Sequence, residues 1–569
     1  MLLQRIGRGS AVRVAKQQVF ANKGGLRYQS SGNRPFLTKN KIVNISSLFI
    51  GLGLGIYAKI RWSSHDELQV FPEPSTTPLN SVGPPKYGSD ADLQKCVVEL
   101  RELLGKEYVR DSEAEIEHHT DNGFNPSKPQ PEHKPRIIIY PGSTEQVSDA
   151  MKIISRYNIP IVPFSGGTSL EGHTYSTRQG IVMNTSRMNQ IVKVNIDDLD
   201  AVLQAGVGWQ QLNEHLSELE GAENLMLGCD CGPGAHVCGM VSTNASGIGA
   251  TRYGSMVSNI ISVTAVLADG TVIKTKRRPR KSSAGYNLTG LLAGSEGTLA
   301  IITEVTVKLQ VRPAHETVVL VQFPTLKDST NAVASLFKSG IQLNAVEFLD
   351  AGMMQCINYS DLTSKKFENY PTLLFKIAGL NKIVVTEYVK EVKKVCQNSN
   401  CRMFEFARDE VEAEELFSVR KNALYVMLDY GYNEISEDAK MWVTDFAVPL
   451  SRLASTLEQA DKLMEAYPLK HLTLGHVGDG NFHLDIFYLP EQYEMCKRVV
   501  DKLAVLALEN EGTCSGEHGI GFGKRAMLED ELGEATISAM RKLKMALDPK
   551  RLLNPDKVFK IDPLDSSKD

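Results

Sequence analysis

The sequence is poor in the features that mark several classes of protein. Its 569 residues include nine cysteines, an odd number scattered along the chain, which argues against a disulfide framework and for a reducing or neutral compartment. No strong excess of basic residues is present, since the formal net charge is -4. A hydrophobic content of 42% with 23% charged residues is ordinary for a globular protein of two or three domains.

Acidic residues are absent from the first 65 positions, which hold eleven Lys or Arg. The rest of the chain carries 52 basic against 67 acidic residues, a balance of -15. Such a body matches nucleic acid poorly and suits a cationic protein partner. The Arg-rich, acid-free residues 1–35 are typical of a mitochondrial transit peptide, with a disordered basic arm as the alternative.

Residues 42–58 form an uncharged run of 17 residues. At helical rise this run spans about 25 Å, enough to cross a thin bilayer, so we expect a single inner-membrane anchor followed by a linker to residue 86. Nine basic residues precede the run, which predicts a catalytic body facing the intermembrane space. The alternative is an apolar part of a longer targeting signal that is removed.

A group of metal-ligand side chains stands in two Gly-rich segments near the C-terminus. His476 and His483 flank an Asp-Gly turn, and Glu517 follows 34 residues after His483, directly before His518. Residues 471–474 and 482–486 read as strands, so a hairpin would hold the two histidines near each other. Two His and one Glu make a ligand set that leaves metal positions open for substrate. Ordinary loop histidines are the alternative for the isolated pair.

Three further Gly-rich segments lie in alternating strands and predict a cofactor site. Residues 165–169 follow a strand, and their small side chains let backbone N–H groups approach a phosphate. No helix pattern follows them, unlike a Rossmann turn. The segments 232–254 and 294–299 are also small and polar. One such loop alone would read as a plain turn, but three suggest a cofactor held between two subdomains.

The motifs at 163–173, 243–254 and 294–298 resemble the FAD-binding domain of the vanillyl-alcohol oxidase family. With the histidine motifs, residues 130–560 are similar to the metal-dependent D-2-hydroxyacid dehydrogenases of that family. The resemblance implies an α+β fold with a two-subdomain FAD-binding domain, an antiparallel-sheet substrate (cap) domain and a C-terminal helical closure. It assigns noncovalent FAD to Pro163, Ser165, Gly166, Gly167, Thr168, Ser169, Gly234, Gly239, Ser242, Thr243, Ser246, Gly247 and Ile302.

We divide the chain into a transit peptide at 1–35, an anchor and linker at 36–86, an FAD-binding domain at 87–312, a substrate domain at 313–472 and a metal and catalytic region at 473–569. Residues 316–406 read as two strand-helix-strand units, and 411–427 as one helix.

The resemblance also implies the chemistry. A divalent metal on His476, His483 and Glu517 binds the substrate oxygens, and zinc fits these ligand types best, although manganese or iron would accept them. His518 takes the hydroxyl proton as general base, and hydride passes to the flavin. Arg420 clamps the substrate carboxylate, whereas its helix pattern alone favours a solvated charge. Asn481 supports the ligands or contacts substrate.

The basic N-terminus makes the chain similar to the mitochondrial branch that passes electrons to cytochrome c. Members acting on D-2-hydroxyglutarate carry Lys-Tyr-Asp where this chain has Val443-Thr444-Asp445. Because an apolar Val gives no reason to bind a diacid, and Lys440 would face the opposite side of a strand, D-lactate is favoured, with D-2-hydroxyglutarate or another D-2-hydroxyacid as the alternative. A membrane-tethered electron-relay flavoprotein with a closed structural metal is the alternative from another class.

Overall fold

The computed structural model describes residues 74–360 and 365–565, which belong to one compact unit that begins at Phe71. The expected transit peptide and the anchor at 42–58 lie outside the described residues. Among the helices of the described part, none is both long and apolar enough to cross a membrane.

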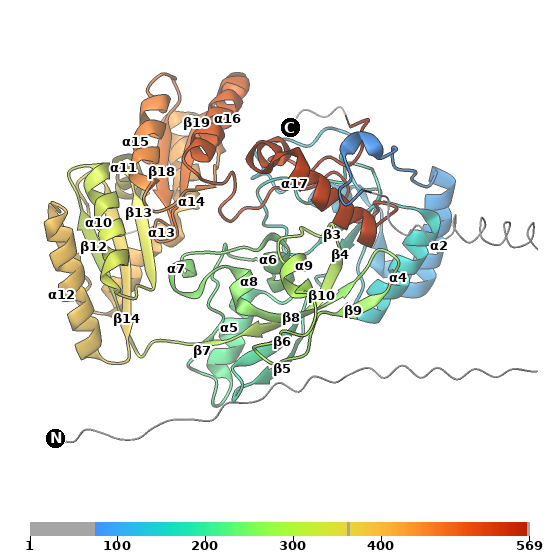
Figure 1. The fold of residues 1–569 in the computed structure, drawn as a ribbon, viewed down its shortest axis with the longest axis horizontal. Helices are drawn as coiled ribbons and strands as arrows, with labels where there is room; N and C mark the ends of the chain where they lie inside the picture. The colour runs from blue at the N-terminus through green and yellow to red at the C-terminus, as the bar shows by residue number, and fades with distance from the viewer. Residues whose placement is uncertain (1–73, 361–364, 566–569) are drawn as a thin grey trace, which may run out of the picture. The chain divides into compact units, whose positions relative to one another are not determined.

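The first subdomain of the expected FAD-binding domain is a small sheet of order β1-β2-β4-β3, in which β2, β3 and β4 run parallel and β1 is antiparallel (Figure 1). Its core is apolar because strand residues such as Ile139 and Ile161 meet the buried face of α4, which begins at the N-cap Ser143. The elements are η1 (Leu79–Ser81), α2 (Asp90–Leu104), η2 (Lys106–Tyr108), β1 (Val109–Arg110), α3 (Glu113–His118), β2 (Ile137–Ile139), α4 (Thr144–Tyr157), β3 (Ile161–Phe164) and β4 (Ile181–Asn184).

The second FAD subdomain is an antiparallel sheet of order β5-β6-β10-β8-β9. It shares one hydrophobic core with the first, since α4 packs against β8 and β10. Its elements are β5 (Ile191–Asn195), β6 (Asp200–Gln204), α5 (Trp209–Glu218), β7 (Leu225–Met226), α6 (Val237–Thr243), α7 (Ala250–Tyr253), α8 (Met256–Asn259), β8 (Ile260–Val266), β9 (Val272–Lys274), α9 (Leu288–Leu292), β10 (Ile301–Lys308) and β11 (Gln310–Val311).

An eight-stranded antiparallel sheet builds the substrate domain, in the order β15-β12-β14-β13-β18-β19-β16 with β17 beside β19. Both faces are covered: Val319 and Val321 point into one core, and Val318 and Leu320 into the other. Its strands are β12 (His315–Gln322), β13 (Ala345–Leu349), β14 (Thr372–Gly379), β15 (Met403–Phe406), β16 (Lys440–Trp442), β17 (Phe446–Ala447), β18 (His471–Gly475) and β19 (Asn481–Tyr488). The sheet thus continues past residue 472, with the candidate ligand His483 in β19 and the candidate ligand His476 directly after β18.

Helices pack on both faces of this sheet. Those on one face are α10 (Leu326–Ser339), α12 (Lys382–Asn398), α15 (Leu453–Met464) and α16 (Tyr493–Glu509), and those on the other are α11 (Ala351–Ser360), α13 (Glu410–Lys421) and α14 (Ala423–Tyr430). The short elements η3 (Gly431–Ile435) and η4 (Pro490–Gln492) complete the domain. The segment 411–427 is helical as expected but is divided at Asn422 into α13 and α14; the Asn422 side-chain amide donates to the same Ser418 carbonyl that accepts the Asn422 backbone N–H.

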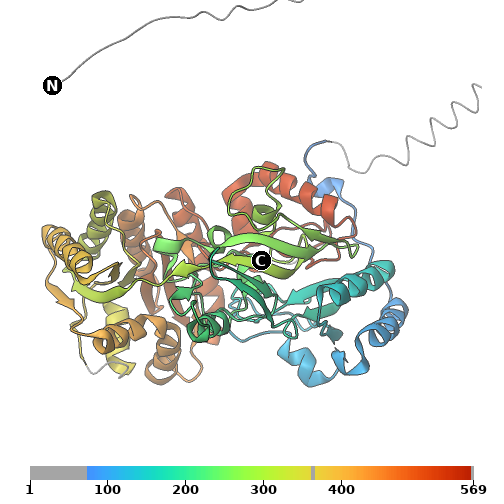
Figure 2. The ribbon, with the colours of Figure 1, turned by 90° about the horizontal axis from the view of Figure 1, so that it is seen from below.

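The C-terminal helix α17 (Arg525–Leu547) lies beside the FAD subdomains and not on the eight-stranded sheet (Figures 1 and 2). After it, Leu553 pairs with Ile161 at the edge of the first sheet, and Asp556 pairs with Arg178 at 2.6 Å. The expected α+β fold, with helical closure at the C-terminus, is confirmed. The segment between α16 and α17 therefore crosses from the substrate domain to the FAD domain, and it carries Glu517 and His518.

Candidate active site

The β18–β19 hairpin brings the two predicted ligand histidines together. Leu474 pairs with His483 across the ladder, His476 follows the end of β18, and the two imidazole rings lie 5.8 Å apart at 89°. The turn needs glycine at Gly480, where φ is +78° and a Cβ would lie 2.1 Å from the Val448 carbonyl oxygen. The hairpin expected from the sequence spacing is present, and it brings the two candidate ligands together.

Glu517 completes the group from the crossing segment. Its Oε1 lies 3.2 Å from His476 Nε2 and 3.4 Å from His483 Nε2, and Ser246 Oγ donates to its other oxygen at 2.7 Å. Ligand atoms about 2.0–2.2 Å from one ion at tetrahedral or octahedral angles are roughly 3–3.5 Å apart, which matches these separations. The three side chains can thus hold one divalent cation.

The remaining imidazole nitrogens of the hairpin are already engaged. His476 Nδ1 is 2.9 Å from Glu347 Oε1, and His483 Nδ1 donates to the Thr444 carbonyl at 2.8 Å. Such contacts fix the rings and leave both Nε2 atoms for a metal. Glu347 lies fully buried in β13 and escaped the sequence analysis, although an acid inside the apolar run 345–349 was a usable signal.

The charges of this cluster strongly perturb its pKa values. Burial disfavours a charged His476, yet Glu347 and Glu517 outweigh that effect and raise its pKa to about 10. Burial likewise opposes ionisation of Glu517, but His476 and His483 hold its pKa well below the ordinary value. The buried carboxylates therefore favour a positive charge at this site, and either bound protons or a metal ion can supply it.

Arg420, at the end of α13, is 8% exposed and lines the cavity beside the hairpin. Its Nε donates to Glu347 Oε2 at 2.7 Å, and its outer nitrogen Nη2 lies 3.5 Å from His476 Nε2. Glu347 thus joins the candidate carboxylate clamp to a candidate metal ligand. A guanidinium held in this way keeps further donors for a substrate carboxylate.

His518 stacks on His483, with ring centroids 5.3 Å apart at 13°. Burial would lower its pKa, but Asp445 and Glu171 outweigh that effect and raise it above the ordinary value. Asp445 is fully buried and accepts the backbone N–H groups of Glu517 and His518, both at 2.9 Å. This anchoring role of Asp445 was also missed by the sequence analysis.

Asn481 is the one predicted catalytic residue that does not line the cavity. Its side-chain amide donates to Asp445 Oδ1 at 2.7 Å and to the Phe446 carbonyl at 3.0 Å. Asn481 supports Asp445, which in turn holds the backbone of Glu517 and His518. A supporting role therefore fits the position of Asn481 better than substrate contact.

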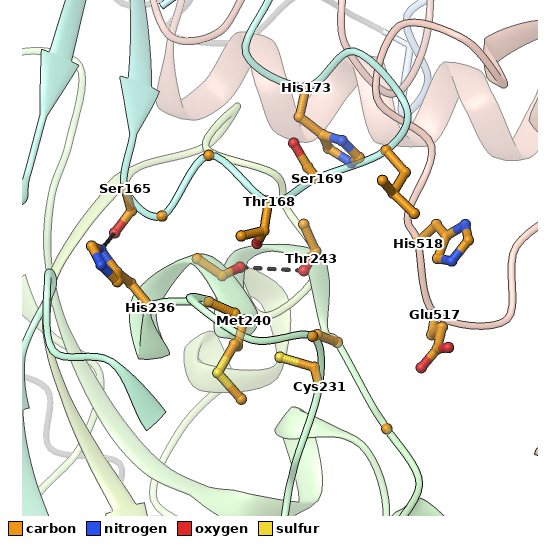
Figure 3. Close-up of a pocket in the computed structure, with 18 of the residues that line it drawn as sticks. Ser165, Thr168, Ser169, His173, Cys231, His236, Met240, Thr243, Glu517 and His518 are labelled. Atoms are coloured by element: carbon orange, nitrogen blue, oxygen red, sulfur yellow. Dashed lines mark hydrogen bonds between the residues drawn. The ribbon is translucent and has the colours of Figure 1, made fainter. Parts of the chain in front are cut away.

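A cavity of about 600 Å³ connects these groups to the predicted flavin loops (Figure 3). Glu517 and His518 lie across it from Ser165 and His236, which are hydrogen-bonded at 3.0 Å. Gly234 and Ser246 lie outside the lining, the latter bonded to Glu517. The other predicted flavin residues line the cavity: Pro163, Ser165, Gly166, Gly167, Thr168, Ser169, Gly239, Ser242, Thr243, Gly247 and Ile302.

The loops fit a large ligand bound through main-chain contacts. A Cβ at Gly166 would lie 2.7 Å from the Gly234 carbonyl oxygen, so only glycine lets the two loops meet there. Gly167, at φ +67°, requires the left-handed conformation. The resulting wall is mostly backbone and small side chains, which suits the dinucleotide expected from the resemblance.

Comparison with known proteins agrees with this geometry. The family description "FAD binding domain" matches residues 135–276, and "FAD linked oxidases, C-terminal domain" matches 312–558. Two solved structures share the fold: p-cresol methylhydroxylase with substrate bound (TM-score 0.69, 18% identity, 83% of this chain and 98% of that chain) and 4-ethylphenol oxidase from Gulosibacter chungangensis (TM-score 0.68, 19% identity, 84% and 98%).

Curated relatives cover most of the chain. The mitochondrial D-lactate dehydrogenase (cytochrome) 1 of Saccharomyces cerevisiae is 47% identical over 88% of this chain and 86% of its own length. The mitochondrial D-lactate dehydrogenase (cytochrome) of Kluyveromyces lactis is 45% identical over 90% and 89%, and that of Arabidopsis thaliana 38% over 75% and 73%. The chain therefore belongs to the family of FAD-linked oxidases that includes the mitochondrial D-lactate dehydrogenases.

Proposed function

We propose that the protein oxidises D-lactate to pyruvate with bound FAD and passes the electrons to cytochrome c. The observation that carries this proposal is the meeting of Arg420, the His476–His483–Glu517 group and His518 in one cavity with the flavin loops. The names of the yeast and plant relatives support the substrate, the cytochrome acceptor and a mitochondrial location.

The residues have separate tasks. Arg420 binds the substrate carboxylate through the guanidinium donors that Glu347 leaves free. His518 takes the hydroxyl proton; its Nδ1 lies 3.6 Å from Glu171 Oε1, which leaves Nε2 for the substrate. The flavin loops would hold FAD, which would supply a hydride acceptor, and His476, His483 and Glu517 would hold a divalent ion, zinc by ligand type, which would supply a Lewis acid for the hydroxyl oxygen. Asp445 and Glu347 do not line the cavity; they position groups that do.

The cavity wall favours a monocarboxylate. Val443 lines the cavity, whereas Lys440 is exposed at the start of β16. A second carboxylate would meet an apolar side chain at Val443 and would be desolvated without a partner. This supports D-lactate over D-2-hydroxyglutarate.

The acceptor and location follow from the chain outside the cavity. Beyond residue 65 the balance of -15 suits a cationic redox protein such as cytochrome c. We infer that residues 42–58 anchor the protein in the inner mitochondrial membrane with the body in the intermembrane space, where that partner would be met.

An anaerobic titration tests the proposal. The full chain, purified with its flavin, is mixed separately with D-lactate, L-lactate and D-2-hydroxyglutarate, before and after chelator treatment. We expect flavin bleaching by D-lactate, loss of bleaching after chelation and recovery with zinc. Flavin absorbance that stays unchanged with every hydroxyacid and every metal would refute the dehydrogenase function and favour the electron-relay alternative.

A further inference from the structure

The carboxylate of Glu296 connects the flavin loop to the segment that carries His518. Glu296 lies between α9 and β10 in the left-handed conformation, with φ +52°, and is 6% exposed. Its Oε1 accepts the backbone N–H of Ile520 and its Oε2 that of Gly521, both at 2.7 Å. These bonds join two stretches of chain more than 220 residues apart.

The segment around His518 is thus held at two points by two buried carboxylates from different domains. Asp445, between β16 and β17, fixes the backbone N–H groups of residues 517 and 518, and Glu296 fixes those of 520 and 521. Gly519 lies between the two points at φ +81°, where a Cβ would come within 2.8 Å of Glu296 Oε1. A close approach of this kind leaves the backbone beside His518 little room to shift.

Further contacts fix Glu296 itself. Its Oε2 lies 3.2 Å from His173 Nε2, its backbone N–H donates to the Ser242 carbonyl at 2.8 Å, and its carbonyl accepts the Asn554 amide at 2.7 Å. Burial opposes ionisation, but His173 and the two N–H donors outweigh it and lower the pKa of Glu296. The side chain is therefore an ionised acceptor at neutral pH, and Glu296 itself is among the residues that line the flavin cavity.

We propose that Glu296 is a positioning residue that holds the general base His518 in register with the flavin. The inference rests on the proposed function. Glu296 acts through the backbone at Ile520 and Gly521. The candidate metal ligands and Arg420 are held by other residues, because Asp445 accepts the Glu517 backbone N–H and Glu347 contacts both His476 and Arg420. Its loss is expected to slow the chemical step and to leave substrate and metal binding unchanged, because misplacement of a reacting group by about 1 Å can cost about 100-fold in rate.

The test compares Glu296→Gln with Glu304→Gln in the full-length protein. In the first variant the amide oxygen of the introduced glutamine can accept one N–H, whereas its NH₂ group would face the other donor. Glu304 follows on β10 but lies outside the cavity lining; its carboxylate meets Thr264 Oγ1 at 3.3 Å and Lys274 Nζ at 3.7 Å. It is therefore a matched control for loss of one carboxylate from the same region.

Two readouts are needed. Stopped-flow reduction of the flavin by D-lactate should show a limiting rate about 10- to 100-fold lower per bound flavin in Glu296→Gln. Its half-saturating D-lactate concentration and its metal content should stay within about threefold of wild type. A general loss of structural order in the variant would change binding as well as rate, so it would not give this result. Amide hydrogen exchange should show faster exchange in residues 515–523 of Glu296→Gln and wild-type exchange in Glu304→Gln.

Wild-type exchange in residues 515–523 of Glu296→Gln overturns the proposal whatever the activity. It is also overturned if the limiting rate per bound flavin is unchanged and only flavin or metal content falls. If Glu296→Gln does not accumulate, Glu296→Asp, which keeps the charge but is shorter by one methylene, is judged by the same criteria. If D-lactate does not reduce the flavin of the wild-type protein, the proposed function is refuted. The two failures can be told apart because the hydrogen-exchange measurement does not depend on turnover.

Discussion

Replacement of Glu347 by Gln should weaken metal binding and substrate binding together. The side chain is fully buried and its two oxygens serve two donors, His476 Nδ1 at 2.9 Å and Arg420 Nε at 2.7 Å. Gln offers one acceptor oxygen, so its NH₂ group must face the other donor. Loss of such an outer contact typically lowers metal affinity or activity about 10- to 100-fold, which corresponds to about 1.4–2.7 kcal/mol. The buried donor left without a partner should separately lower the free energy of unfolding by about 1–3 kcal/mol.

The assay is a competition titration of zinc against a chromophoric chelator, with the half-saturating D-lactate concentration measured on the same samples. Glu316→Gln is the matched control, because Glu316 lies on β12 of the same sheet and pairs with Lys376 at 3.0 Å, where both side chains are partly exposed. A zinc dissociation constant for Glu347→Gln within about threefold of wild type would refute the view that this carboxylate orients His476.

Three other changes test separate parts of the site. His518→Gln should lower the limiting rate of flavin reduction by about 10²- to 10⁴-fold with unchanged zinc content by mass spectrometry, because the base is not a ligand; loss of zinc would contradict that division of roles. Val443→Lys should raise turnover of D-2-hydroxyglutarate relative to D-lactate by about tenfold or more, since it adds a charged partner inside the cavity, and an unchanged ratio would count against the specificity argument. Arg408 and Lys365 lower the pKa of Glu412 to about 2, so its contribution to stability is full above the unfolded pKa near 4.5 and is lost as pH falls toward 2. The urea midpoint of wild type should therefore exceed that of Glu412→Gln at pH 6, and the two midpoints should converge toward pH 3. The same difference between the midpoints at both pH values would show that ionisation of Glu412 is not linked to folding.

The parts of the site that could be predicted from the sequence are the local ones. His476 and His483 flank a turn between two alternating strands, and the pairing of Leu474 with His483 follows from that pattern. The small residues of 165–169 likewise predict a cavity wall lined by backbone. In both cases the chemistry and the geometry lie within one short stretch of chain, which is the range over which periodicity and turn chemistry are informative.

The contacts of the supporting carboxylates could not be found in this way. Glu347 lies 129 residues before His476, and Glu296 lies 224 residues before Ile520, so their contacts exist only after the domains have packed. Arg420 illustrates the same limit: on its helix it reads as a solvated charge, and only the packing of α13 against β12 and the approach of Glu347 bury it. Resemblance, and not periodicity, identified it.

The distribution of buried charge gives a physical reason to expect a cation at the hairpin. Glu347 and Glu517 both face His476, and Arg420 is already engaged by Glu347. Without a metal, the carboxylates draw a proton onto His476, whose pKa rises to about 10. A protonated imidazole has no lone pair to offer a ligand, so this state cannot coordinate anything. A divalent ion held by His476, His483 and Glu517 would balance the same negative charge and would take the place of that proton, so the carboxylates that raise the pKa of His476 in the metal-free site would also favour a bound cation.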